Sequence, residues 1–204
     1  MPPISHFTHG SNLPAVLAAG ELRSHTAAAT VVDVADVSIK ARRMTIAVGC
    51  GPGGVVGDYV PFYFAPRSPM LFRLQKEHTE GRGDGQRALI YVATTTERLL
   101  GAGLPCVFSD GNAAHHLSTF SADLNEMGGR VDWELMEAVI WANTPEDGDR
   151  VRRRQAEFLV HGAVPLDLVE ELVVIDDSVR SRVQELLDQA GSNLPVVVRP
   201  NWYF

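Results

Sequence analysis

The sequence predicts a single domain of the α+β class that spans residues 1–204. A length of 204 residues suits one hydrophobic core, and 45% hydrophobic with 21% charged residues is ordinary for a globular protein. Short apolar runs alternate irregularly with helical segments, without the long regular crossovers that a doubly wound parallel sheet requires. Because no internal repeat or linker interrupts the chain, we expect one mixed sheet flanked by helices.

The first twenty residues predict a strand followed by a helix. ISHFT at 4–8 alternates as a short strand. Ser11 or Asn12 is the expected N-cap of the helix, Pro14 lies in its first turn, and Gly20 ends it.

The next fifty residues predict a helix, a loop and a strand. Residues 27–48 are rich in Ala and Val and favour a helix. Five glycines and one proline within 49–57 favour a mobile loop. YVPFYFAPRSPML at 59–71 predicts a strand that leads into a helix capped by Ser68, and its prolines place that strand away from the sheet centre.

Apolar runs predict most of the sheet in the second half. The expected strands are 88–93, 106–110, 157–160, 171–175 and 195–199. Helices are expected from Thr96, from Ser178 to Gly191, and within 113–154, where Trp133 and Trp141 have apolar spacing. A turn is expected at Asp110-Gly111-Asn112.

Composition limits the classes of function. No apolar stretch is long enough to cross a bilayer and the N-terminus lacks a signal-peptide pattern, so we expect a cytoplasmic protein without a membrane partner. Cys50 and Cys106 are too few for a disulfide framework and lack metal-site spacing.

The net charge of −7 argues at first against a nucleic-acid partner. However, residues 1–87 hold nine Lys/Arg and seven Asp/Glu, whereas residues 88–204 hold nine and eighteen. A basic groove in the first half therefore remains open, and so does an ordinary solvated surface. The residues that would form the groove are Lys40, Arg42, Arg43, Arg67, Arg73 and Lys76.

Two strand-borne groups are candidates for chemistry. Strand alternation places Gln155 and Glu157 on one face, and His6 and Thr8 on one face of the first strand. Glu157 is either an exposed strand residue, the commoner case, or a carboxylate that stabilises positive charge on a ribose. A lone strand histidine such as His6 is more often structural than a ligand.

The remaining polar pairs are less informative. Arg42 and Arg43 are either solvated charges or guanidinium groups that hold a phosphate or face a base. His115 and His116 are adjacent, so their side chains diverge, and no carboxylate lies at a ligand spacing; we expect no metal site. A hydrolase triad is disfavoured because no G-x-S-x-G sequence is present.

Several segments resemble the DarT family of DNA ADP-ribosyltransferase toxins along nearly the whole chain. The matching stretches are HFTHGSNLPAVLAAGEL, IKARR, GGVVGDYVPFYFAPRSPML, GLPCVFSDGNA, RRQAEFLV and NWYF. The resemblance implies an ADP-ribosyltransferase-like fold, with a split mixed β core flanked by helices and NAD in the cleft between the two halves of the sheet.

The resemblance also assigns roles to residues. It implies that Glu157 is the catalytic glutamate, favouring the positively charged transition state at the nicotinamide-side ribose. Arg43 would be the second catalytic residue, which contacts NAD and activates the acceptor base electrostatically, because Arg is too basic for simple proton abstraction. The implied NAD-binding residues are Ser5, His6, Phe7, Thr8, Asn12, Leu13, Leu22, Arg43 and Tyr63, and the implied acceptor-binding residues are Met70, Asn112, Gln155 and Arg67.

The implied reaction is NAD-dependent transfer of one ADP-ribose to thymine in single-stranded DNA, with NAD as co-substrate and no metal. An unpaired base enters a pocket without the cost of unpairing, which makes a single strand a sensible acceptor. Guanine, RNA or protein are alternative acceptors, and a non-catalytic nucleic-acid-binding module is the alternative from another class. The implied partner is a macrodomain antitoxin that removes the modification.

Overall fold

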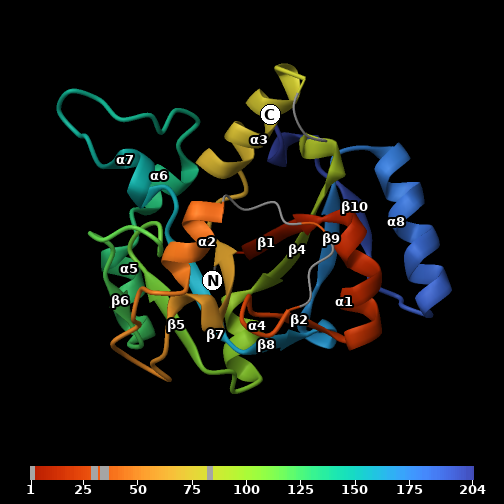
Figure 1. Cartoon of the computed structure of the whole chain (residues 1–204), viewed down its shortest axis with the longest axis horizontal. Coiled ribbons are helices and arrows are strands. Elements are labelled where there is room, and N and C mark those ends of the chain that lie inside the picture. The colour runs from red at the N-terminus through yellow and green to blue at the C-terminus, as the bar shows by residue number, and fades with distance from the viewer. Residues whose placement is uncertain (1–2, 29–31, 33–36, 82–84) are drawn as a thin grey trace.

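The computed structural model describes residues 3–28, 32, 37–81 and 85–204, which form one α+β unit (Figure 1). The strands are β1 Pro3–His9, β2 Glu21–Arg23, β3 Tyr59–Tyr63, β4 Leu89–Thr95, β5 Cys106–Ser109, β6 Phe120–Ser121, β7 Glu157–His161, β8 Ala163–Pro165, β9 Glu171–Val174 and β10 Val196–Val198. The helices are α1 Leu13–Ala19, α2 Val37–Arg43, α3 Pro69–Thr79, α4 Thr96–Gly101, α5 Met127–Arg130, α6 Trp133–Glu137, α7 Arg150–Arg153 and α8 Asp177–Ala190.

Eight strands form one mixed sheet in the order β10-β9-β4-β1-β3-β7-β5-β6, and β2 pairs with β8 in a small second sheet. Only β9 and β10 pair in parallel among the strand pairs of the described residues. The predicted strands are confirmed, and the mixed sheet with its helices confirms the α+β class.

The large sheet is split in its middle. β1 pairs with β4 over seven positions and β3 pairs with β7 over five, but β1 and β3 pair only at Ser5 and Tyr63. Beyond that position the two strands separate, and the His6 ring donates from Nδ1 to the Pro61 carbonyl at 2.9 Å. The sheet therefore consists of two halves joined at one point.

Pro61 corrects the expectation that prolines keep this strand away from the sheet centre, because β3 lies between β1 and β7. In a strand, the backbone nitrogen and carbonyl of one residue point to the same side. The Pro61 carbonyl bonds the His6 ring of β1, so the missing N–H of Pro61 faces the split, where no ladder bond is needed. Proline is tolerated at the centre for that reason.

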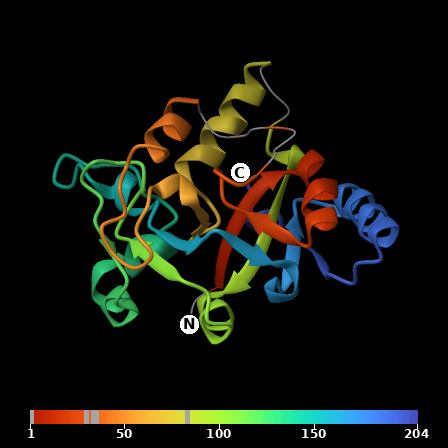
Figure 2. The same cartoon turned by 60° about the horizontal axis from the view of Figure 1, so that its bottom comes forward.

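Helices cover the sheet on several sides. In Figure 1, α8 and α1 lie beyond β9 and β10, and Figure 2 shows α2 and α3 on one side of the sheet and α4 on the opposite side. Along α8, Val179, Val183 and Leu187 recur every four residues and are buried, so one face of the helix packs into the core. No helix in the described ranges is apolar and long enough to cross a membrane.

The predicted N-cap of α3 is confirmed, whereas the predicted N-cap of α8 is wrong. Ser68 accepts from Leu71 N and caps α3 as predicted, and Gly191 ends α8 in the left-handed conformation at φ 66°. Asp176, not Ser178, caps the start of α8, because its carboxylate accepts from Val179 N. Asn12 occupies the N-cap of α1 without a side-chain capping bond.

The weakly patterned segments differ most from expectation. Within 27–48 the described helix is α2 alone, and residues 29–31 and 33–36 lie outside the described residues. The glycine-rich 49–57 forms a turn closed by backbone hydrogen bonds such as Val48 N to Gly54 O. Within 113–154 there are short helices, and Trp141 lies outside them.

Candidate active site

A cavity of about 270 Å³ opens where β1 and β3 separate. Its wall comes from β1, α1, β2, α2, β3 and the start of α3, so both halves of the sheet contribute. Apolar and aromatic side chains dominate the wall, with a few polar groups among them, which is typical of a site for a nucleotide-sized ligand. The split of the sheet is therefore also the place of the cavity.

Glu157 begins β7 close to this cavity and is buried, with 1% of its side chain exposed. This excludes the exposed strand residue, which was the commoner of the two alternatives that the sequence left open. Its strand partners are Tyr63 on β3 and Ser109 on β5. Oε1 accepts from Ala113 N at 2.9 Å, and both carboxylate oxygens accept from Arg43 Nη1, Oε1 at 3.2 Å and Oε2 at 2.9 Å. A buried carboxylate held this way is fixed in orientation.

Arg43 connects Glu157 to the cavity. It is the last residue of α2, lines the cavity, and has 13% of its side chain exposed. While Nη1 binds Glu157, Nη2 is buried and has no hydrogen-bond partner among the described residues. A side chain at Gly57 would lie 2.5 Å from Met44 Sδ, so the glycine allows the end of α2 to approach β3.

A turn after β5 carries the third contact to Glu157. Ser109 Oγ donates to Gly111 O at 2.7 Å and accepts from Glu157 N at 3.3 Å. Asn112 Nδ2 donates to Gln155 Oε1 at 3.1 Å. Because these bonds join the turn to the start of β7, they place Ala113 N against the carboxylate.

His6 lies in the split and lines the cavity. Burial is the main cause that lowers the pKa of His6 to about 4; the hydrogen bond to the Pro61 carbonyl opposes this shift, and the Arg43 charge adds to it. The ring is therefore neutral at pH 7. Since Nδ1 carries the proton donated to Pro61, Nε2 is left as an acceptor, suited to a ligand hydroxyl.

Asn12 fastens the cavity wall on the side of α1. Its Nδ2 donates to Thr8 Oγ1 at 2.9 Å and to Val32 O at 2.8 Å, and its Oδ1 accepts from Val32 N at 2.9 Å. Asn12, Thr8 and Val32 all line the cavity. Asn12 therefore acts on the shape of the wall as well as on its polarity.

Aromatic and apolar side chains close the wall near Arg43. Tyr63, Met70, Phe7 and Leu22 line the cavity, and the Tyr63 ring stacks on Phe7 at 6.0 Å. Burial, with the Glu157 charge second, raises the pKa of Tyr63, so its hydroxyl stays protonated. These residues present a flat, uncharged surface to a ligand ring.

The structure does not bring the other expected residues to the cavity. Ser5 and Leu13 are buried away from its wall, Leu13 within the main core. Asn112 and Gln155 bond each other behind Glu157. Arg67 donates from Nε to Tyr203 O at 2.8 Å and serves the C-terminal segment.

Sequence reasoning missed Ala113, Ser109 and Gly57 as parts of the site. Ala113 acts through its backbone, and Gly57 through the absence of a side chain, so residue type alone gives no signal. The rings of His115 and His116 stack at 4.5 Å in the turn after β5, which corrects the expectation that these side chains diverge. Within the described residues, no group of three or more His, Cys, Asp or Glu is placed to hold a metal.

Comparisons with known proteins agree with this geometry. The profile of the family described as ssDNA thymidine ADP-ribosyltransferase, DarT, matches residues 5–204. The DNA ADP-ribosyl transferase of Thermus aquaticus is 37% identical over 204 residues, covering 98% of this chain and 88% of that protein. The Mycobacterium tuberculosis protein of the same name is 36% identical over 202 residues, covering 98% and 87%.

The similar solved structures are also DarT proteins. Thermus sp. 2.9 DarT in complex with ADP-ribosylated ssDNA has a TM-score of 0.91 and 36% identity, covering 99% of this chain and 96% of that chain. The same protein in complex with NAD+ has a TM-score of 0.88 and 35% identity, covering 99% and 97%. The matching family profile and the similarity to these solved structures make the chain an ADP-ribosyltransferase. More particularly, the chain belongs to the DarT family of ssDNA thymidine ADP-ribosyltransferases.

Proposed function

We propose that this protein transfers ADP-ribose from NAD to thymine in single-stranded DNA, with Glu157 and Arg43 as the catalytic residues. The proposal of these residues rests mainly on the position of the Glu157 carboxylate. This carboxylate is buried and accepts hydrogen bonds from Arg43 and from Ala113 N. Arg43 links it to a cavity lined from both halves of the sheet. Family membership supports the reaction, and the geometry supports the residues.

Glu157 favours cleavage of the bond between ribose and nicotinamide. That bond breaks with its electron pair leaving on nicotinamide, so positive charge develops on the ribose. A fixed carboxylate stabilises this charge without reorganising. A base nitrogen then bonds the anomeric carbon and its proton is released, which balances the transfer.

Arg43 serves both reactants. Its Nη1 orients the Glu157 carboxylate, and its unpartnered Nη2 is a donor for NAD or for the acceptor base. A guanidinium beside a base stabilises the anion formed on proton loss, so the nitrogen becomes a better nucleophile. The role is electrostatic, because Arg keeps its own proton.

The cavity suits NAD on two observations. The buried Nη2 of Arg43 has no hydrogen-bond acceptor among the described residues, and a ribose or phosphate oxygen of NAD would supply one. The Nε2 acceptor of His6 and the flat face of Tyr63 are matched by a ribose hydroxyl and by the nicotinamide ring. Both features lie on the wall contributed by β1, α2 and β3.

Part of the acidic charge in the second half of the chain is paired with arginine within the protein. Four carboxylates in the segments that precede β7 pair with Arg152 or Arg153. They are those of Asp110, Asp132, Asp147 and Asp149. The two guanidinium groups offset two of the four carboxylates, so this cluster keeps two excess negative charges and does not itself attract the phosphate backbone.

The experiment is incubation of the protein with NAD and a panel of single-stranded oligonucleotides. Each oligonucleotide contains one test base type in a background sequence that is the same for the whole panel. Mass spectrometry should find one added ADP-ribose only where thymine is present, and a duplex of the same strand should remain unmodified. Glu157→Ala should abolish the product. Modification of guanine, RNA or protein instead would move the acceptor to that class, and DNA binding without NAD consumption would support the non-catalytic alternative.

We further propose a cytoplasmic toxin with an antitoxin of the macrodomain class that removes the modification. The relative from Thermosipho africanus is named a DNA ADP-ribosyl transferase-DNA ADP-ribosyl glycohydrolase fusion protein, and this chain covers 48% of its length at 25% identity. Expressing the chain with and without a macrodomain hydrolase, and measuring growth and DNA modification, tests this pairing.

A further inference from the structure

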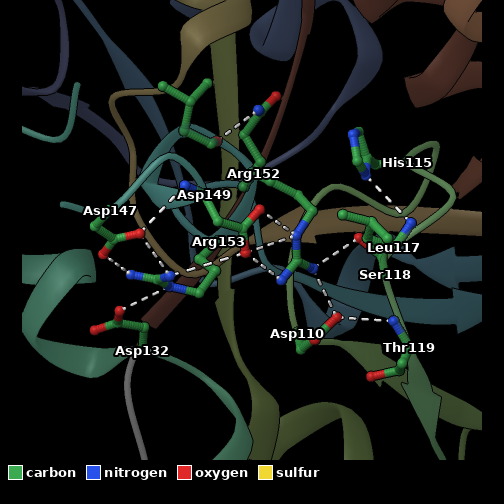
Figure 3. Close-up of polar contacts among 12 residues, drawn as sticks. Asp110, His115, Leu117, Ser118, Thr119, Asp132, Asp147, Asp149, Arg152 and Arg153 are labelled. Atoms are coloured by element: carbon green, nitrogen blue, oxygen red, sulfur yellow. Dashed lines mark hydrogen bonds and ion pairs between the residues drawn. The ribbon is translucent and has the colours of Figure 1, made fainter. Parts of the chain in front are cut away.

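Three consecutive arginines, Arg152, Arg153 and Arg154, lie three to five residues before Glu157, the first residue of β7. Figure 3 shows the first two with their guanidinium groups between aspartates of different segments. Arg152 has 10% of its side chain exposed and Arg153 has 27%. Burying two guanidinium groups requires partners for their donors, so this cluster fixes several loops relative to β7.

Arg152 bridges the helix α7 region to the turn after β5. Its Nη1 donates to Asp110 Oδ1 at 3.0 Å and to Ser118 Oγ at 3.1 Å. Its Nε and Nη2 donate to the Asp149 carboxylate, each at 2.8 Å. The planar fork allows one guanidinium to bind both carboxylates at once, which a lysine could not do.

The same turn is also tied to Arg152 through the backbone. Asn112 N donates to Arg152 O at 3.0 Å, and Asp110 Oδ1 accepts from Thr119 N at 2.8 Å. A Cβ at Gly111 would lie 2.5 Å from Arg152 Nη1 and 2.9 Å from Arg152 O. The turn therefore packs directly on residue 152, and only glycine fits at the contact.

Ala113 lies within this turn of residues 110–119, and its backbone N–H donates to Glu157 Oε1 at 2.9 Å. Apart from Arg43, Ala113 is the donor to the Glu157 carboxylate within the part of the chain that the structure describes. A shift of the turn would thus change the orientation of the carboxylate while leaving the NAD cavity intact, because residues 110–119 and 152 are outside its wall.

We propose that Arg152 is a positioning residue for the transfer reaction, which holds the 110–119 turn where Ala113 N fixes the Glu157 carboxylate. The inference rests on the proposed role of Glu157. A misplacement of a reacting group by about 1 Å costs on the order of 10²-fold in rate. Arg152→Gln should therefore lower kcat by about 10²-fold and change KM for NAD by less than about 3-fold.

Arg153→Gln is the matched control. Arg153 also pairs with aspartates, through Nη2 to Asp147 at 2.6 Å and Nε to Asp132 at 3.1 Å, but it bonds no residue of the turn at 110–119. At saturating oligonucleotide, Arg153→Gln should keep kcat within about 3-fold even if its melting temperature falls as much as that of Arg152→Gln. Equal loss of kcat in both variants would reduce Arg152 to a structural residue and overturn the proposal.

Gly111→Ala tests the same turn without removing any charge. The added methyl group meets Arg152 and must displace the turn, so kcat should again fall with KM for NAD kept. If Arg152→Gln fails to fold, this variant alone decides, and full kcat in Gly111→Ala refutes the inference. Retained activity in Glu157→Ala would instead refute the proposed function, whereas an inactive Glu157→Ala with a fully active Arg152→Gln would refute only the role of Arg152.

Discussion

Replacing Arg43 by Met should strand the Glu157 carboxylate in the protein interior. Of the three hydrogen bonds given to this carboxylate, Arg43 supplies two, and Oε2 keeps no other donor among the described residues. Hydrogen bonds to a charged group contribute about 1.5–3 kcal/mol each, and breaking a buried ion pair costs about 3–5 kcal/mol. Because both bonds come from the same atom, Nη1, we expect Arg43→Met to lower the free energy of unfolding by about 3–4 kcal/mol.

Urea unfolding of wild type and Arg43→Met at pH 7 measures the loss. Arg42→Met is the matched control, since Arg42 is exposed on the same helix and should stay within about 0.5 kcal/mol of wild type. Glu157→Gln in the Arg43→Met background removes the stranded charge and should recover most of the stability. If the free energy of unfolding of Arg43→Met fell by less than about 1 kcal/mol, the Glu157 carboxylate would reach water without Arg43. The inference that its burial depends on Arg43 would then be wrong.

Three further predictions concern the cavity wall. The pKa of His6 is about 4 in the folded protein and 6.5 ordinarily, so the stability that the neutral ring contributes is present above pH 6.5 and is lost as the pH falls towards 4. Between pH 7.5 and pH 5, the free energy of unfolding of the wild type should therefore fall by about 2 kcal/mol more than that of His6→Gln. Equal losses in the two proteins would contradict the lowered pKa. Gly57→Ala should displace the Met44 thioether, which is exposed and flexible, so we expect destabilisation below about 1 kcal/mol and a kcat within about 3-fold of wild type; a larger loss of kcat would show that the glycine is needed to place Arg43. Asn12→Ala should release Val32, cost about 1–3 kcal/mol and raise the Kd for NAD in calorimetry, which unchanged binding would contradict.

The strands could be predicted because their apolar runs are local properties. β4 and β9 contain the buried apolar runs 89–93 and 172–174, and β5 is buried along its whole length from Cys106 to Ser109. The position of β3 could not be predicted in this way. Pro61 normally excludes a central strand, and only the separation of β1 from β3 makes it acceptable there.

The burial of Glu157 also could not be read from its strand. The alternation around Glu157 fits an exposed residue and a buried one equally well. What decides is contact with Arg43 and Ala113, which lie 114 and 44 residues away in sequence. Resemblance pointed to Glu157 and Arg43 as the proposed catalytic residues, whereas the roles proposed for Ala113 and Arg152 could be inferred only from the folded structure, because those roles are geometric.

The most direct test of the account is the turnover of Glu157→Gln compared with its affinity for NAD. The amide keeps the size of the side chain but removes the charge that stabilises the developing cation, so kcat should fall by about 10³-fold or more while the Kd for NAD changes little. A Glu157→Gln protein that modifies single-stranded DNA at the wild-type rate would contradict the central claim.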